Sequence, residues 1–128
     1  MQEMSTAVQY KLPIKIFILN NQYMGMVRQW QELLHEKNYS ESYTEALPDF
    51  VKLAEAYGCV GIQATKPDEL DEKINEMINT KEPVIFDCRV DPAENCFPMI
   101  PSGKPHNQML LGPEDEKEEV SDEGKTLV

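Results

Sequence analysis

Residues 14–19 form the strongest apolar run in the chain, interrupted only by Lys15. The run is rich in β-branched residues and is too short for a typical helix, so it predicts a strand. A nearly continuous apolar run, rather than an alternating one, is typical of strands buried on both faces of a parallel sheet. We therefore expect residues 14–19 to be buried on both faces and to belong to such a sheet.

Helical and strand-like patterns alternate along the rest of the chain. Apolar residues at helical spacing predict helices, and short apolar runs predict further strands. The expected helices are residues 2–10, 24–34, 48–57 and 67–79, and the expected strands are residues 14–19, 60–62 and 83–90. This alternation predicts an α/β fold with a parallel sheet and flanking helices. Three strands are few for a parallel sheet that must be covered on both faces, so we expect it to be part of a larger sheet.

A proline and a glycine support the boundaries of the expected third helix. Pro48 is expected in the first helical turn, where its missing N–H has no cost, and Gly58 at the C-cap. In the second helix, Val27, Trp30 and Leu34 are expected on one side.

Charge separates the end of the chain from the rest. The net charge is −11, which argues against a nucleic-acid partner. Residues 113–128 hold seven acids and two lysines and have few apolar groups, which predicts a disordered acidic tail after a single partial domain at residues 1–112.

No apolar run approaches the roughly 20 residues that span a membrane, and there is no signal-peptide pattern, so we expect a cytoplasmic protein without a membrane partner.

The three cysteines, Cys59, Cys88 and Cys96, form no CxxC pair. A zinc site or a disulfide framework is therefore not expected, and a reducing compartment is the simpler interpretation. Cys59 and Cys88 lie in or beside apolar strand-like segments, where buried thiols are common.

A polar loop with two adjacent asparagines follows the first strand. Ligands in open α/β sheets bind beyond the carboxyl ends of strands, which is the place of Asn20, Asn21, Gln22 and Tyr23. Asparagine and main-chain oxygens are hard ligands that suit Mg²⁺, and Gly25 would let the backbone approach a diphosphate. As a bare dipeptide, however, an asparagine pair is more often a turn.

A longer string narrows this interpretation. Residues 17–31 read FILNNQYMGMVRQWQ, and further characteristic strings occupy residues 2–8, 47–58 and 97–103. Together, from residue 2 to about residue 111, they resemble the C-terminal thiamine diphosphate-binding domain of the acetolactate synthase (acetohydroxyacid synthase) large-subunit family. The acidic tail lies outside the resemblance.

The resemblance implies roles for particular residues. The side chain of Asn21 and the main-chain carbonyl of Tyr23 would bind Mg²⁺. Six consecutive residues would line the diphosphate and thiazolium end of the cofactor: Asn21, Gln22, Tyr23, Met24, Gly25 and Met26. Trp30, Ser102 and Gly103 would lie at the substrate channel. From the residues alone, Trp30 could instead be a core aromatic, and Met26 could serve helix packing.

The resemblance also implies the reaction and the partners. Enzymes of this family use thiamine diphosphate and Mg²⁺ to decarboxylate pyruvate and to condense the hydroxyethyl unit with pyruvate or 2-ketobutyrate, in branched-chain amino-acid biosynthesis. The complete enzyme would be a homodimer or tetramer with a regulatory small subunit, and FAD would bind through other domains. The Gly-Asp-Gly start of the cofactor motif does not occur in this chain, and the family's catalytic glutamate belongs to another domain. We therefore expect no catalytic residue here and no activity of the isolated chain.

Two alternatives remain open at this stage. The chain could belong to another thiamine diphosphate-dependent decarboxylase, carboligase or oxidase, or it could be a non-catalytic α/β interaction module. No nucleophile motif accompanies His35 or His106, so neither is expected to be catalytic. Asp87, near a strand end, could contact a ligand, but a structural partner is the favoured interpretation.

Overall fold

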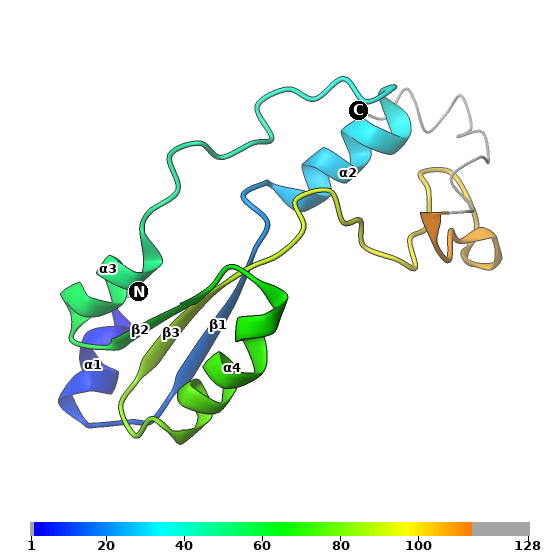
Figure 1. The fold of residues 1–128 in the computed structure, drawn as a ribbon. Helices are drawn as coiled ribbons and strands as arrows, with labels where there is room; N and C mark the ends of the chain where they lie inside the picture. Colours follow the sequence, from blue (N-terminus) through cyan, green and yellow to red (C-terminus); the bar gives the residue numbers. More distant parts are fainter. Residues whose placement is uncertain (1, 114–128) are drawn as a thin grey trace. The chain divides into compact units, whose positions relative to one another are not determined.

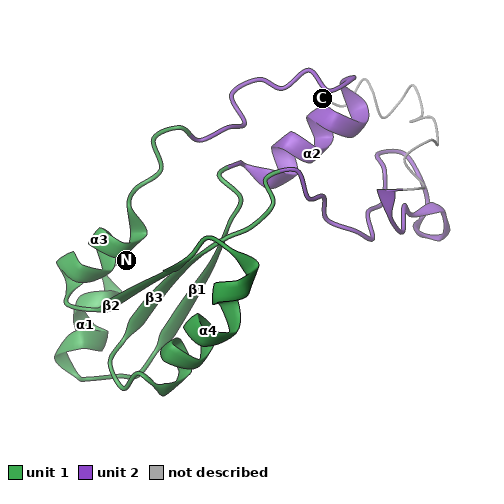
Figure 2. Cartoon of the chain, viewed as in Figure 1, with its two compact units in different colours: residues 1–22, 45–92 green, residues 23–44, 93–128 purple. Residues whose placement is uncertain are grey.

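The computed structural model describes residues 2–113 of the 128-residue chain. The chain divides into two compact units (Figure 2). Unit 1 comprises Met1–Gln22 and Glu45–Pro92, and unit 2 comprises Tyr23–Thr44 and Ala93–Val128. The predicted disordered tail, except for Pro113, lies outside the described residues.

Unit 1 is built on a parallel sheet of three strands (Figure 1). Strand β1 is Lys15–Asn20, β2 is Val60–Ala64 and β3 is Val84–Arg89, in the order β1-β3-β2. In the register, Phe86 of β3 lies between Phe17 of β1 and Ile62 of β2. The predicted α/β class with a parallel sheet and flanking helices is confirmed.

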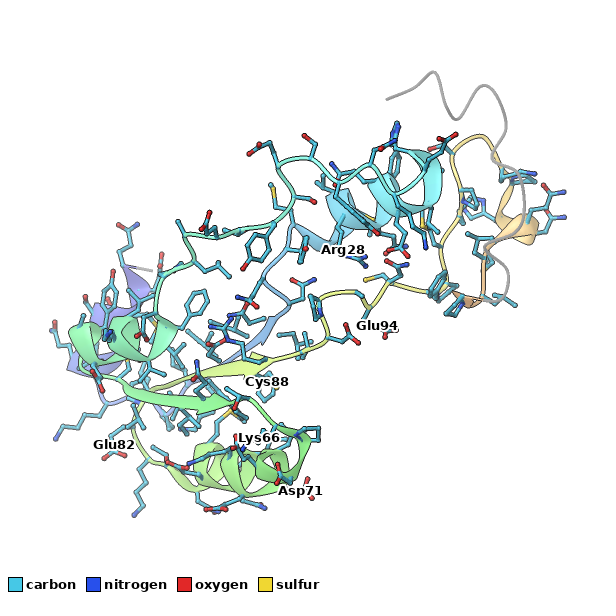
Figure 3. The ribbon with its side chains drawn as sticks, turned by 45° about the horizontal axis from the view of Figure 1, so that its top comes forward. Arg28, Lys66, Asp71, Glu82, Cys88 and Glu94 are labelled. Carbon is cyan, nitrogen blue, oxygen red and sulfur yellow. The ribbon has the colours of Figure 1, made fainter. Side chains whose placement is uncertain are left out.

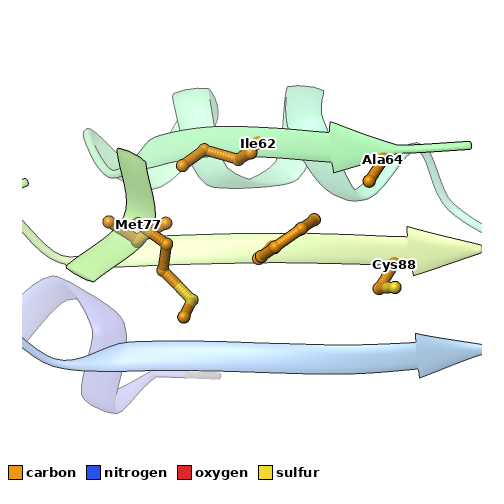
Figure 4. Close-up of a cluster of buried hydrophobic side chains, with 6 residues drawn as sticks. Ile62, Ala64, Met77 and Cys88 are labelled. Atoms are coloured by element: carbon orange, nitrogen blue, oxygen red, sulfur yellow. The ribbon is translucent and has the colours of Figure 1, made fainter. Parts of the chain in front are cut away.

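One face of the sheet packs against a single helix. Helix α4, Leu70–Asn79, follows a 3-10 turn η1 at Pro67–Glu69, so the single helix predicted at residues 67–79 has two parts. Met77 of α4 meets the buried side chains of β2 and β3 in an apolar cluster (Figure 4). The cluster consists of Ile62, Ala64, Met77, Val84, Phe86 and Cys88.

The opposite face packs against two helices, α1 at Glu3–Gln9 and α3 at Phe50–Tyr57. Their cluster is Met4, Ala54, Cys59 and Ile85, with Ile16 and Ile18 packed beside it. With helices on both faces, β3 is buried along nearly its whole length, as expected of a central parallel strand.

The expected burial of residues 14–19 on both faces is wrong. Phe17 and Leu19 are 39% and 69% exposed, because β1 pairs only with β3 in the described chain and lies at the edge of the sheet. The apolar run indicated a strand correctly, but the strand order places β3 at the centre. Lys15, which interrupts the run, donates from Nζ to the main-chain carbonyls of Thr80 and Glu82, at 2.7 Å each.

The ends of α3 follow from local chemistry. Asp49 caps the helix, because its carboxylate accepts from the Lys52 N–H at 3.0 Å. This hydrogen bond holds the pKa of Asp49 below its usual value. Pro48 therefore precedes the cap, and its expected place in the first turn is wrong. Gly58 ends the helix in the left-handed region, at φ +78°, which confirms the predicted C-cap.

Unit 2 contains helix α2 at Gly25–Leu34 and a 3-10 turn η2 at His106–Gln108. Isolated antiparallel bridges join Tyr23 to Tyr43 and Met99 to Leu110. Nothing in residues 2–113 forms a helix with the length and hydrophobicity that a bilayer crossing requires.

Candidate functional site

A buried carboxylate organises the carboxyl end of the sheet in unit 1. Asp87 is 1% exposed and accepts from Asn20 Nδ2 at 2.8 Å and from Gln63 Nε2 at 2.9 Å. The Nε atom of Arg89 lies 3.3 Å from Asp87 Oδ2. Buried charges need such partners, because an unpaired one would carry a desolvation cost of several kcal/mol, on the order of 3–5. The structural interpretation of Asp87 is therefore supported.

The strand register explains why these side chains meet. Asp87 pairs with Gln63 across β2, and side chains two residues apart on a strand share a face. Arg89 therefore projects on the same face as Asp87. Asn20 stands two residues beyond Ile18, the β1 partner of Asp87. The result is a polar end on a face that is otherwise apolar.

Asn20 uses both ends of its amide inside the protein. Its Nδ2 donates to Asp87, and its Oδ1 accepts from the Gln22 N–H at 3.1 Å. This side-chain bond to the backbone two residues on is an Asx-type turn. Gln22 adopts φ +62°, which is uncommon for a residue with a side chain. Of the two asparagines, the first is thus a buried part of the scaffold, while Asn21 is half-buried.

The boundary between the units divides the predicted cofactor loop. Asn21 and Gln22 belong to unit 1 together with Asn20, whereas Tyr23 and the residues after it belong to unit 2. The two predicted metal ligands, Asn21 and Tyr23, thus fall on opposite sides of this boundary.

In unit 2, the residues before α2 are held by the segment near Tyr43. The Met24 N–H donates to the Ser42 carbonyl at 2.8 Å, and the Tyr23 and Tyr43 rings lie 5.1 Å apart. The Arg28 guanidinium lies 6.0 Å from the centre of the Tyr23 ring, within the range of a cation–π contact. Gly25 is the first residue of α2.

Helix α2 buries polar side chains. Gln29 is 1% exposed, and its amide pairs with the backbone of Cys96, accepting from the N–H at 2.7 Å and donating to the carbonyl at 3.0 Å. Arg28 donates from Nη2 to the carbonyls of Ala93 and Glu94, at 2.8 and 3.2 Å; Arg28 and Glu94 are labelled in Figure 3. Two polar residues of α2 thereby hold the segment that begins at Ala93.

The apolar side of α2 lines a hollow of about 740 Å³. Its lining residues are Met26, Val27, Trp30, Gln31, Leu34, His35, Glu36 and Asn38. Trp30 is half-buried and lines this open hollow. Met26 is exposed beside it.

Ser102 and Gly103 lie elsewhere in unit 2. They belong to a turn in which the Lys104 N–H donates to the Pro101 carbonyl at 3.1 Å, and Gly103 adopts φ +78°. Among the described residues, neither of them lines the hollow around Trp30.

The remaining titratable residues of the described part of the chain form no second cluster. Burial raises the pKa of the Cys59 and Cys88 thiols, which lowers their reactivity. Between residues 2 and 113, no three His, Cys, Asp or Glu side chains gather into a possible metal site. His35 lines the hollow in unit 2, and His106 begins η2.

Sequence reasoning missed Arg28, Gln29 and Gln63, and it left the partners of Asp87 unnamed. A charged residue inside an apolar strand, as at Asp87, indicates a buried hydrogen-bond partner. Asn20, the polar residue at the end of β1, was available for that role. Arg28 and Gln29 carried no comparable signal, because polar residues on a helix ordinarily face solvent.

Comparison with known proteins decides the family. Residues 1–88 match the family described as thiamine pyrophosphate enzyme, C-terminal TPP binding domain. The chain belongs to this family. It is 49% identical to the acetolactate synthase large subunit of Cyanidium caldarium over 111 residues, which is 86% of the chain and 19% of that protein. It is 45% identical to the large subunit of Haemophilus influenzae over 117 residues, or 91% of the chain and 20% of that protein.

The fold of this thiamine pyrophosphate enzyme domain is also found in a solved structure. The thiamine diphosphate-dependent 4-hydroxybenzoylformate decarboxylase of Rhodococcus jostii RHA1 matches with a TM-score of 0.60 and 27% identity, over 69% of this chain and 16% of that chain. The chain spans about a fifth of the length of the curated relatives it matches.

Proposed function

We propose that the chain is the cofactor-binding C-terminal part of an acetolactate synthase large subunit. The observation that carries this proposal is 49% identity to such a subunit across 86% of the chain, including the loop at residues 20–26. The solved decarboxylase is less similar, at 27% identity, so the synthase is favoured over another enzyme of the family.

The complete protein would decarboxylate pyruvate and condense the resulting two-carbon unit with pyruvate or 2-ketobutyrate. Thiamine diphosphate, when bound, supplies the electron sink for decarboxylation, and Mg²⁺ anchors its diphosphate. The chain's own residues bind and orient the cofactor. Proton transfer would depend on a glutamate outside this chain.

The structure offers features that fit a magnesium-bound diphosphate. No acidic residue stands in the first turn of α2, and Gly25 is its first residue. A helix N-terminus without acids presents N–H groups to an anion, and a residue without Cβ allows close approach. The loop before it supplies neutral, hard oxygens of the kind Mg²⁺ prefers.

Particular residues would hold the group. The Asn21 side-chain oxygen and the Tyr23 carbonyl would bind Mg²⁺, and Gln22, Met24, Gly25 and Met26 would line the cofactor. The involvement of Asn20 in internal hydrogen bonds supports Asn21 as the metal ligand of the pair.

Trp30 would act in substrate choice. It lines a hollow whose walls are largely apolar, together with Val27 and Leu34, and such walls suit the alkyl end of a small 2-keto acid. Ser102 and Gly103 would approach the channel from the segment that Arg28 and Gln29 hold.

The partners follow from the same proposal. The complete protein would be a cytoplasmic homodimer or tetramer, with a regulatory small subunit and with FAD bound through other domains. Its partners would include neither nucleic acid nor a membrane.

Calorimetric titration of thiamine diphosphate and Mg²⁺ into the complete enzyme that contains this sequence tests the metal assignment. Asn21→Ala removes one hard oxygen from the metal and should weaken cofactor binding, with activity partly restored by excess Mg²⁺ and cofactor. Trp30→Leu should leave cofactor binding near normal and change the ratio of acetolactate to acetohydroxybutyrate formed from mixed substrates. Unchanged cofactor affinity in Asn21→Ala would refute the placement of the metal. Formation of aldehyde alone from pyruvate would refute the synthase activity.

A further inference from the structure

The hydrogen bonds at the carboxyl end of the sheet form a relay that leads to the proposed metal ligand. Asp87 Oδ1 accepts from Asn20 Nδ2 at 2.8 Å, and Asn20 Oδ1 accepts from the Gln22 N–H at 3.1 Å. Asn21 stands between the two ends of the second bond. The backbone direction at Asn21 therefore depends on a side chain, Asn20, which Asp87 holds.

We infer that Asp87 is a positioning residue for metal and cofactor binding. It orients the Asn20 amide, and the amide holds the turn that presents Asn21. This inference rests on the proposed function, because the turn matters for catalysis only if Asn21 binds Mg²⁺.

The energetics favour a fixed amide at Asn20. An ionised carboxylate can only accept hydrogen bonds, so Asp87 requires that Asn20 present Nδ2 and leaves Oδ1 for the backbone. A reversed amide would set oxygen against carboxylate and an N–H₂ group against the Gln22 N–H. The carboxylate thus determines which way the amide points.

The bond to Gln22 acts where the backbone is least favourable. Gln22 has φ +62°, a conformation that costs a residue with a side chain on the order of 1 kcal/mol or more. A hydrogen bond from its N–H to a fixed acceptor offsets part of this cost, since a net bond contributes about 1 kcal/mol. Without the fixed acceptor, the turn would relax toward φ below zero and Asn21 would lose its direction.

Gln63 supplies a matched control. It donates to the other oxygen of the same carboxylate, Asp87 Oδ2, at 2.9 Å, and has no bond in the relay itself. Gln63→Ala therefore removes a partner of Asp87 while Asn20 and Gln22 keep their bonds.

The experiment measures the affinity of the complete enzyme that contains this sequence for thiamine diphosphate, by calorimetry at a series of Mg²⁺ concentrations. Asp87→Leu, which cannot accept a hydrogen bond, should raise the Mg²⁺ concentration for half-maximal binding about tenfold. Asp87→Asn keeps an acceptor oxygen and should recover most of the affinity, and Gln63→Ala should change it little. At saturating Mg²⁺ and cofactor, kcat of Asp87→Leu should approach that of the unmodified protein.

A double-mutant cycle tests the relay itself. Asn20→Leu should weaken cofactor binding about as much as Asp87→Leu. The double variant should be little worse than either, because both substitutions break the same chain of hydrogen bonds from Asp87 to the Gln22 N–H. If Asp87→Leu does not fold, Asn20→Leu carries the test, since Asp87 keeps Gln63 and Arg89 there.

The outcomes separate the two proposals. Absence of cofactor binding by the unmodified protein would overturn the proposed function. Normal binding by the unmodified protein, together with equal affinity in Asp87→Leu or Asn20→Leu, would overturn the positioning role alone. Loss of affinity in Gln63→Ala equal to that in Asp87→Leu would also overturn it, because the effect would then be general destabilisation.

Discussion

Units 1 and 2 are stabilised by different means. Unit 1 has two apolar clusters, one on each face of a parallel sheet, with Phe86 and Val84 fully buried. In unit 2, two polar side chains of one helix, Arg28 and Gln29, bond to backbone groups near Ala93 and Cys96, and the apolar side of the helix lines a hollow. The hydrophobic effect is non-directional, whereas a hydrogen bond requires a defined distance and angle. The difference indicates that unit 1 depends on the volume of its buried side chains, whereas unit 2 depends on particular hydrogen bonds between α2 and the segment that begins at Ala93.

The largest effect should come from the centre of unit 1. Phe86→Ala would remove a fully buried ring and should lower the free energy of unfolding of unit 1 by about 3–5 kcal/mol. Phe17, which contacts the same ring at a centroid distance of 4.6 Å, is 39% exposed on the edge strand. Phe17→Ala should therefore cost less than half as much. Urea denaturation, monitored through hydrogen exchange at the β3 amides, measures the free energy of unfolding of both variants. Equal losses of this free energy would contradict the central position of β3.

A smaller but still large effect is expected where a helix meets the sheet. A Cβ added at Gly61 would lie 2.9 Å from the Cα and carbonyl oxygen of Val51 in α3, a contact that the backbone cannot relieve by a rotamer change. Gly61→Ala should destabilise unit 1 by about 1–3 kcal/mol. Gly112→Ala is the control, because no atom lies within 4 Å of its added Cβ. Equal melting temperatures for the two variants would refute the close packing of α3 on β2.

In unit 2 the effect should be local. Gln29→Leu would leave the N–H and carbonyl of Cys96 without the Gln29 amide as partner. The free energy of local opening of residues 93–99, measured by hydrogen exchange, should fall by about 1–2 kcal/mol. Gln31→Leu removes one exposed bond, to the Ser40 carbonyl, and should have little effect. Hydrogen–deuterium exchange of residues 93–99 measures the change. Equal loss of protection in the β3 amides would show that the two units do not differ as described.

The smallest expected effect distinguishes the thiols of the two units. Cys96 is exposed, whereas burial raises the pKa of Cys59 and Cys88, so fewer thiolates form at those positions at a given pH. Labelling with a thiol reagent at pH 8, resolved by mass spectrometry, should modify Cys96 first. Raising the pH should increase labelling at the buried positions. Faster labelling of Cys88 than of Cys96 would contradict the packing of unit 1.

Local patterns in the sequence predicted most of unit 1. The apolar stripes of α3 and α4 indicated their helices, and Gly58 marked a C-cap that the structure confirms. The strand order was not predictable, because the apolar run at residues 14–19 and the one in β3 indicate strands equally well. Only the pairing of distant residues places β3 at the centre and leaves Leu19 exposed.

Helix α2 shows a second limit. Spacing correctly placed Val27, Trp30 and Leu34 on one side, but spacing does not state which side of a helix meets the protein. The buried contacts of Arg28 and Gln29 depend on backbone groups far along the chain, near Cys96. The site residues from Asn21 to Met26, with Trp30, Ser102 and Gly103, came from the resemblance and remain predictions.

The strand order also bears on how the chain assembles as it leaves the ribosome. Lys15 of β1 pairs with Val84 of β3, so β1 emerges long before its neighbour exists. At roughly 5–20 residues per second, β1 is synthesised several seconds before β3. Strand β2, which pairs with β3 from Val60 onward, is separated from it only by η1 and α4. The segment β2-α4-β3 can therefore close first as a local nucleus, and β1 joins these two strands later.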